Sequence, residues 1–133
     1  MRVAELMVTE LETVRADQSV ADAIGLLADS HVSALPVLDG ERRFVGVLST
    51  SDVLQAEAEC GSPGERERLF ENGIVRDLMT SQPKTVGPDD DVREVAQQML
   101  YLDVHRLFVV FDGELVGVIS QSDIVRGVAT ARI

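Results

Sequence analysis

The chain has 133 residues, 45% of them hydrophobic, which is enough to bury the core of one domain or of two half-domains that share it. Its net charge of −11 at pH 7 opposes non-specific binding to nucleic acid or anionic lipid, because those partners require a basic surface. No apolar run reaches the roughly 20 residues of a membrane helix, the N-terminus lacks a signal-peptide pattern, and the single cysteine cannot form an internal disulfide. We therefore expect a cytoplasmic protein that does not contact membranes.

The first half of the chain predicts a short series of strands and helices. A helical turn around Leu6 and a loop precede a brief extended segment over residues 13–15. Ser19 is placed to cap a helix with one apolar stripe. Residues 34–38 and 44–48 read as two strands joined by an Asp39-Gly40 turn, and residues 53–58 return to a helical pattern. The predicted stripe consists of Val20, Ala23, Ile24, Leu27 and Ala28.

The second half repeats the first. Met7 recurs as Met79 at an offset of 72 residues, and Asp52 recurs as Asp123 at an offset of 71. The repeat predicts a second strand, helix, strand, strand and helix in the same order. Asp91 takes the capping position of the first of these helices, with Glu94 in the capping-box position. The corresponding stripe consists of Val92, Val95, Ala96, Met99 and Leu100.

The duplication predicts an α+β fold built from two β-α-β-β-α units. We place the first repeat at residues 1–60, a linker at 61–74 and the second repeat at 75–133. Gly61, Pro63 and Gly64 interrupt the helical pattern, and alternating charges follow them. A repeat of about 60 residues is marginal by itself, so we expect two small sheets to pack with pseudo-two-fold symmetry around a shared core.

Each repeat ends in the pattern Gly-x-x-Ser-x-x-Asp, at residues 46–52 and 117–123. The serine falls at a helix N-cap and the aspartate in the first turn, beside unpaired backbone N–H groups. Such a helix end attracts phosphate, and the carboxylate can accept hydrogen bonds from a vicinal diol, so the pair suits a ribonucleotide. The same spacing is also that of a capping box, which needs no ligand. Both interpretations remain open at this point.

In order and spacing, these motifs resemble a tandem pair of cystathionine-β-synthase (CBS) domains, also called a Bateman module. The resemblance covers nearly the whole chain. It depends on Asp-Leu-Met-Thr at residues 77–80, Leu-Pro-Val at 35–37 and the two Gly-x-x-Ser-x-x-Asp patterns. It implies a regulatory module that binds AMP, ADP, ATP or S-adenosylmethionine in clefts between the two repeats. No cofactor is expected, since the nucleotide, with or without Mg²⁺, is the regulatory ligand.

The resemblance also implies which residues contact the ligand. Asp52 and Asp123 would hold the ribose hydroxyls, Ser49 and Ser120 would lie near the phosphates, and strand residues would frame the base. Phe108 stands where the family usually has proline, and His105-Arg106 matches a basic pair that often meets phosphates. His105 is either a surface residue or a phosphate contact, and His31 is expected to be exposed or to cap a helix. The full predicted set is Thr13, Val14, Ala34, Leu35, Pro36, Ser49, Ser51, Asp52, Thr85, Val86, His105, Arg106, Leu107, Phe108, Ser120, Ser122 and Asp123.

Three functions compete at this stage. The leading one is a nucleotide sensor that forms a homodimer and signals to an effector protein or through its own oligomer. The second is a structural dimerisation domain whose pockets are vestigial. An enzyme comes third, because the chain has no Ser/His/Asp set, no metal-ligand spacing of Cys and His, and no Walker-type glycine loop.

Overall fold

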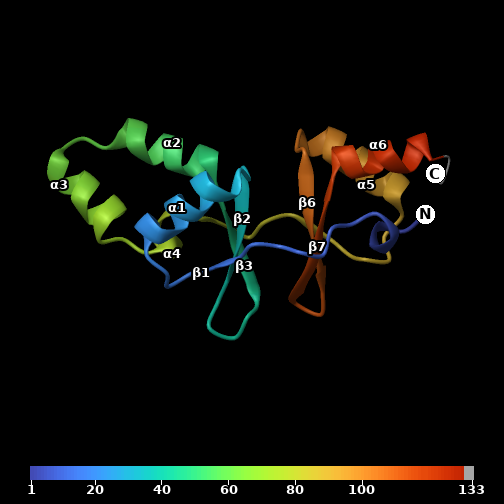
Figure 1. Cartoon of the computed structure of the whole chain (residues 1–133), viewed down its shortest axis with the longest axis horizontal. Helices are drawn as coiled ribbons and strands as arrows, with labels where there is room; N and C mark the ends of the chain where they lie inside the picture. Colours follow the sequence, from blue (N-terminus) through green and yellow to red (C-terminus); the bar gives the residue numbers. More distant parts are fainter. Residues whose placement is uncertain (131–133) are drawn as a thin grey trace. The chain divides into compact units, whose positions relative to one another are not determined.

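The computed structural model describes residues 1–130 and confirms the α+β class. Each repeat contains the predicted strand, helix, strand, strand and helix (Figure 1). The elements of the first repeat are β1 (Val14–Arg15), α1 (Val20–Ser30), β2 (Ala34–Leu38), β3 (Phe44–Ser49) and α2 (Thr50–Glu59). Those of the second are β5 (Thr85–Val86), α5 (Val92–Leu102), β6 (Arg106–Phe111), β7 (Glu114–Ser120) and α6 (Gln121–Ala129). The last residues of the predicted second repeat, 131–133, lie outside the described residues.

Short elements precede each repeat and fill the linker. A 3₁₀ turn, η1 (Val3–Glu5), opens the chain, as expected from the pattern around Leu6. The linker holds α3 (Pro63–Arg66) and one π-helical turn, η2 (Glu67–Glu71), and it is followed by α4 (Val75–Leu78) and β4 (Thr80–Ser81). None of the helices within residues 1–130 has the length and apolar character needed to span a bilayer.

The chain forms two compact units that differ from the sequence repeats in one respect. The first-repeat unit is Glu12–Pro83, and the second-repeat unit combines Met1–Leu11 with Lys84–Ile133. The segment that precedes the first strand of each repeat therefore belongs to the unit of the other repeat. Each unit contains its own buried cluster, and the packing of the two sheets on each other stays a prediction.

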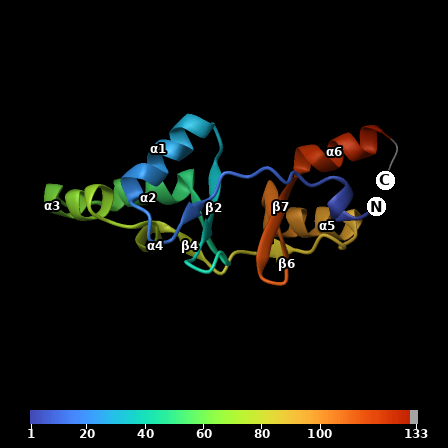
Figure 2. The ribbon, with the colours of Figure 1, turned by 60° about the horizontal axis from the view of Figure 1, so that its bottom comes forward.

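The first-repeat unit is built on a four-stranded sheet in the order β1-β2-β3-β4. β1 pairs with β2 in parallel, and the other two pairs are antiparallel. α1 and α2 lie on the same side of this sheet in both views (Figures 1 and 2). The buried cluster consists of Val14, Ala16, Ala23, Leu27, Leu35, Val37, Leu48 and Val75. Its last member comes from α4, so the segment after the linker completes this core.

The second-repeat unit has a three-stranded sheet in the order β5-β6-β7. α5 and α6 lie on one side of it (Figures 1 and 2). The N-terminal segment adds an isolated antiparallel bridge between Val8 and Val118. The cluster consists of Val3, Val86, Val95, Met99, Leu107, Val109 and Ile119, so η1 contributes here as α4 does in the other unit.

We call these two segments, residues 1–11 and 75–83, the crossing segments, and each of them passes over a glycine. A Cβ added at Gly46 would lie 2.7 Å from the Met79 sulfur and 2.8 Å from the Thr80 carbonyl oxygen. At Gly117 the corresponding distances are 2.9 Å to the Met7 sulfur and 2.9 Å to the Val8 carbonyl oxygen. The glycine that opens each Gly-x-x-Ser-x-x-Asp pattern is thus needed for close backbone approach.

Three local expectations need correction. The apolar stripes are only partly buried, since Ala28 is exposed and Leu100 is 78% exposed. Asp91 caps α5 by accepting from the Arg93 backbone N–H, 2.7 Å away, and α5 shows no reciprocal bond from Glu94. The residue with a left-handed conformation in the first hairpin is Arg42, with φ of 66°, rather than Gly40. Helix length and hairpin register are unaffected by these differences.

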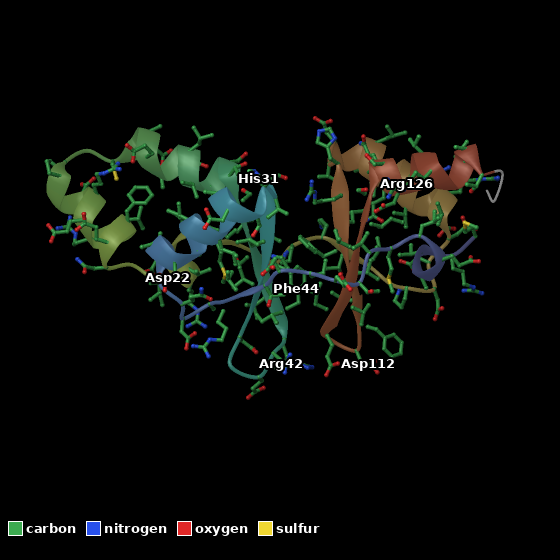
Figure 3. All side chains as sticks on the ribbon, viewed as in Figure 1. Asp22, His31, Arg42, Phe44, Asp112 and Arg126 are labelled. Carbon is green, nitrogen blue, oxygen red and sulfur yellow. The ribbon has the colours of Figure 1, made fainter. Side chains whose placement is uncertain are left out.

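The two hairpins differ in how they turn. Arg42 and Asp112 mark their tips in Figure 3. In the first, one Asp39 carboxylate oxygen accepts from the backbone N–H groups of Glu41 and Arg43, at 2.8 and 2.9 Å. The Arg43 hydrogen bond is the main cause that lowers the pKa of Asp39 from its usual value. In the second, Asp112 and Gly113 both have positive φ, which makes a tight two-residue turn.

Candidate functional site

Both Gly-x-x-Ser-x-x-Asp patterns form complete capping boxes. The Ser49 hydroxyl accepts from the Asp52 backbone N–H at 3.1 Å, and Asp52 Oδ2 accepts from the Ser49 N–H at 2.8 Å. Ser120 and Asp123 repeat the arrangement at the same two distances. The capping interpretation is therefore correct for both copies. It uses one oxygen of each carboxylate and leaves the other for further contacts.

In the first-repeat unit, the second oxygen of Asp52 contacts a neutral hydroxyl. The Thr80 side chain donates to Asp52 Oδ1 at 2.9 Å, and Asp52 is half-buried. Both residues line an open groove of about 600 Å³ between α2, the linker helices and α4. A carboxylate oxygen has two lone pairs, so Oδ1 can accept a second donor from a molecule in the groove. The other lining residues are Gln55, Ala56, Glu59, Cys60, Glu65, Arg68, Leu69, Asp77, Leu78 and Met79.

In the second-repeat unit, the second oxygen of Asp123 contacts a cation. The Arg126 guanidinium forms an ion pair and hydrogen bond with Asp123 Oδ1. Arg126 lies on α6 (Figure 3), where i,i+3 side chains share a face. Asp123 is buried, with 4% of its surface exposed, whereas the Arg126 side chain is 68% exposed. These residues line a smaller cavity of about 370 Å³ together with Glu5, Leu6, Gly127 and Thr130.

The predicted strand residues lie within the sheet of their own unit. In the first-repeat unit, Ala34 pairs with Ser49, and Val14 pairs with Val37 beside buried Leu35 and Pro36. In the second-repeat unit, Arg106 pairs with Ser120 and Thr85 with Phe108. The sheets thus bring Ala34 next to Ser49 and Arg106 next to Ser120. Thr13 is exposed, Val86 is 5% exposed, and Leu107 and Phe108 are buried.

The remaining predicted residues have different positions. Ser51 and Ser122 are exposed in the first turns of α2 and α6. His105 is exposed, and its carbonyl accepts from the Gln121 N–H at 2.9 Å, so its backbone holds the start of α6. His31 is the C-cap residue of α1 with φ of 55°, and it is exposed, as expected (Figure 3).

The family is decided by the match of most of the chain to a known domain. The family model of the CBS domain matches residues 3–59 and 75–130. The chain belongs to the CBS-domain family. Two matched stretches confirm the resemblance to a tandem CBS pair, with one CBS domain for each repeat.

Solved CBS pairs share this fold. The chain is similar to a crystal structure of CBSX2 in complex with AMP, with a TM-score of 0.82 and 31% identity over 99% of this chain and 98% of that one. It is also similar to the CBS domain pair of protein MJ0100 in complex with 5′-methylthioadenosine and S-adenosyl-L-methionine, with a TM-score of 0.78 and 22% identity. This match covers 98% of each chain, and at this identity it shows only that the two chains share a fold.

The curated relatives that the chain matches are longer proteins. The chain is 32% identical to an inosine-5′-monophosphate dehydrogenase of Korarchaeum cryptofilum, over 92% of this chain and 23% of the relative. It is 30% identical to the chloroplastic CBS domain-containing protein CBSX2 of Arabidopsis thaliana, over 87% of this chain and 58% of the relative. The chain therefore spans between about a quarter and three fifths of these two proteins.

The sequence analysis missed two contacts of the CBS motif aspartates. Thr80 belongs to the pattern that opens the second repeat, so nothing local connects it with Asp52, 28 residues earlier. Arg126 could have been found, because a cation three residues after a helical carboxylate is a recognisable pairing signal. The structure shows that the two aspartates, equivalent in the repeat, have different partners.

Proposed function

We propose that this CBS pair is a regulatory module that binds an adenosine-containing nucleotide, namely AMP, ADP, ATP or S-adenosylmethionine. The similarity to CBSX2, whose crystal structure holds AMP, carries this proposal because it extends over the whole chain at 31% identity. The module itself performs no chemistry in this proposal. It reports nucleotide levels to an effector protein or through its own oligomer.

The residue that we propose reads the ribose is Asp52. Its Oδ2 is held by the cap, so the carboxylate has one fixed orientation, and its Oδ1 accepts a single hydrogen bond from Thr80. A ribose hydroxyl can donate to the same oxygen without removing either contact. The helix N-terminus of α2, with Ser49 at its cap, suits the phosphate end of the same ligand. The backbone of Ala34, Leu35 and Pro36 on the neighbouring strand is proposed to frame the base, since the side chains of Leu35 and Pro36 are buried.

Calorimetry with AMP and 2′-deoxy-AMP tests this proposal. The deoxy ligand lacks one donor to a charged acceptor, which corresponds to roughly ten- to a hundred-fold weaker binding. Asp52→Asn should abolish most of this discrimination and weaken AMP binding. Equal affinity for the two ligands in the unsubstituted protein would contradict the ribose assignment.

Asp77→Asn is the matched control. Asp77 lines the same groove and also accepts a capping hydrogen bond, from the Ile74 N–H at 3.2 Å. The substitution removes the same charge from the same groove at a site with no proposed ribose contact. It should leave the ratio of AMP to 2′-deoxy-AMP affinity unchanged. Thermal unfolding of both variants reports any loss of helix capping, expected at about 0.5–2 kcal/mol.

A structural dimerisation domain is the second candidate. Both capping boxes satisfy the helix N-termini with the chain's own groups, and large apolar side chains are exposed on α2 and α6. Leu54 is 69% exposed, Val125 65% and Val128 59%. We propose that these faces form a homodimer, with or without nucleotide. Light scattering at micromolar concentration should give twice the chain mass of 14.5 kDa, and a species of 14.5 kDa alone would contradict it.

A further inference from the structure

The two aspartates differ in what a ligand must displace. Asp123 is buried and has both oxygens engaged, Oδ2 by the Ser120 N–H and Oδ1 by the Arg126 guanidinium. A neutral hydroxyl is a weaker donor to a carboxylate than a guanidinium, whose hydrogen bonds are charge-assisted. Oδ1 of half-buried Asp52 can accept a ribose hydroxyl beside Thr80, whereas Asp123 is only 4% exposed, so a ribose diol has to displace the stronger guanidinium donor to reach its Oδ1.

The first-repeat unit has no such competitor at the matching positions. Arg126 is equivalent to Gln55 at the repeat offset of 71, and a neutral amide cannot form an ion pair. Thr80, which contacts Asp52, is equivalent to Val8 at the offset of 72, and valine has no donor in its side chain. The differences at these two pairs of equivalent positions thus give Asp52 a neutral partner and Asp123 a charged one.

We propose that Arg126 is a specificity-determining residue that closes the Asp123 site to the ribose diol, so that AMP occupies the Asp52 site alone. This inference rests on the proposed nucleotide binding. The smaller cavity agrees with it, since about 370 Å³ lies beside Asp123 and about 600 Å³ beside Asp52. Arg126 acts through Asp123 by holding Asp123 Oδ1. The exposed side chain of Arg126 lines the cavity.

The test measures how many AMP molecules bind to each chain. Isothermal titration of the unsubstituted protein should give about one AMP per chain, with any second site at least about ten-fold weaker. Arg126→Gln, which copies Gln55, should raise the number to about two. In a chain that carries Asp52→Asn, AMP should bind roughly ten- to a hundred-fold more weakly, and the addition of Arg126→Gln should restore about one tightly bound AMP per chain.

Two further variants keep the proposal testable if Arg126→Gln lowers stability. Asp123→Asn alone should leave AMP affinity and stoichiometry unchanged, because that site is already closed. Arg126→Lys keeps the positive charge and should keep the number at about one. A merely structural role of the Asp123–Arg126 pair would change the melting temperature of Arg126→Gln and leave its stoichiometry at about one.

The outcomes separate this inference from the proposed function. Two equal sites in the unsubstituted protein, or one site that Asp123→Asn removes, would overturn the role of Arg126 and leave nucleotide binding intact. A folded Arg126→Gln variant that still binds about one AMP per chain would also overturn the role of Arg126 and leave nucleotide binding intact. Absence of AMP binding in the unsubstituted protein and in every variant would overturn both.

Discussion

The two units pack a segment over a strand glycine in the same way, but the aspartates of their Gly-x-x-Ser-x-x-Asp patterns have different partners. In each, a crossing segment lays a methionine sulfur and a backbone carbonyl over the glycine of the last strand, at Gly46 and at Gly117. In each, a serine and an aspartate form a capping box with the same bond lengths. The partners of the free carboxylate oxygen then differ, Thr80 for Asp52 and Arg126 for Asp123. Packing requirements are therefore equal in the two copies, whereas the chemistry of the site is not.

The largest expected effect concerns which fragment folds. Residues 1–60 contain the first sequence repeat but lack Val75, Leu78 and Met79, which pack in or against the core of the first-repeat unit. Residues 12–83 contain that unit completely. We expect the 12–83 fragment to unfold cooperatively in urea, and the 1–60 fragment to be unfolded or to aggregate. Circular dichroism and urea titration of both fragments measure this. A cooperative fold of 1–60 would show that the crossing segment is dispensable.

The next largest effect on stability is expected where a crossing segment lies close to a strand glycine. Gly46→Ala and Gly117→Ala place a Cβ within 3 Å of a carbonyl oxygen, so the crossing segment must move. We expect each to lower the free energy of unfolding by about 1–3 kcal/mol. Gly25→Ala is the control, because Gly25 lies in α1 with nothing within 4 Å of an added Cβ. It should raise stability by about 0.5–1 kcal/mol. Equal effects at all three positions would contradict the packing argument.

A smaller effect follows from making the two sites alike. Thr80→Val copies Val8 and removes the hydroxyl that donates to Asp52. Because Thr80 is exposed and water can replace it, the free energy of unfolding should fall by only about 0.5–1.5 kcal/mol. Urea denaturation of Thr80→Val against Thr85→Val, another exposed strand threonine, isolates the Asp52 contact. A loss for Thr80→Val no larger than that for Thr85→Val would contradict a specific contribution of the Thr80–Asp52 hydrogen bond.

The smallest expected effect on stability concerns the Asp39 carboxylate, which is hydrogen-bonded in the first hairpin. Because backbone N–H groups lower the pKa of Asp39 in the folded state, the unfolded chain binds its proton more tightly. The ionised carboxylate therefore stabilises the fold above the unfolded value of 3.8, and this contribution is lost as the pH falls through the lower folded pKa. NMR titration of the Asp39 carboxyl should give a pKa below 3.8. Asp39→Ala should reduce stability at neutral pH and lose that effect on acidification. A titration at or above 3.8 would contradict the hydrogen-bonded loop.

Much of the site was predictable because its determinants are local. The capping of α2 by Ser49 and of α6 by Ser120 depends on residues three positions apart, and the apolar periodicity of α1 and α5 depends on one helical turn. The internal duplication then gives the order of strands and helices twice. The sequence alone therefore determined the family, the fold class and the position of both aspartates.

Only the tertiary structure decided which side chain contacts the free oxygen of Asp52. β4 pairs with β3 through Ser81 and Gly46, 35 residues apart, and no local pattern specifies such a pairing. Strand propensity predicts that a segment is extended. Which strand it pairs with depends on the path of the chain in three dimensions. Thr80 reaches Asp52 by that path, and Val8 takes the equivalent place in the other unit. Asp52 has a hydroxyl partner because the crossing segment brings Thr80 to its helix end, whereas the partner of Asp123 is Arg126 of the same helix.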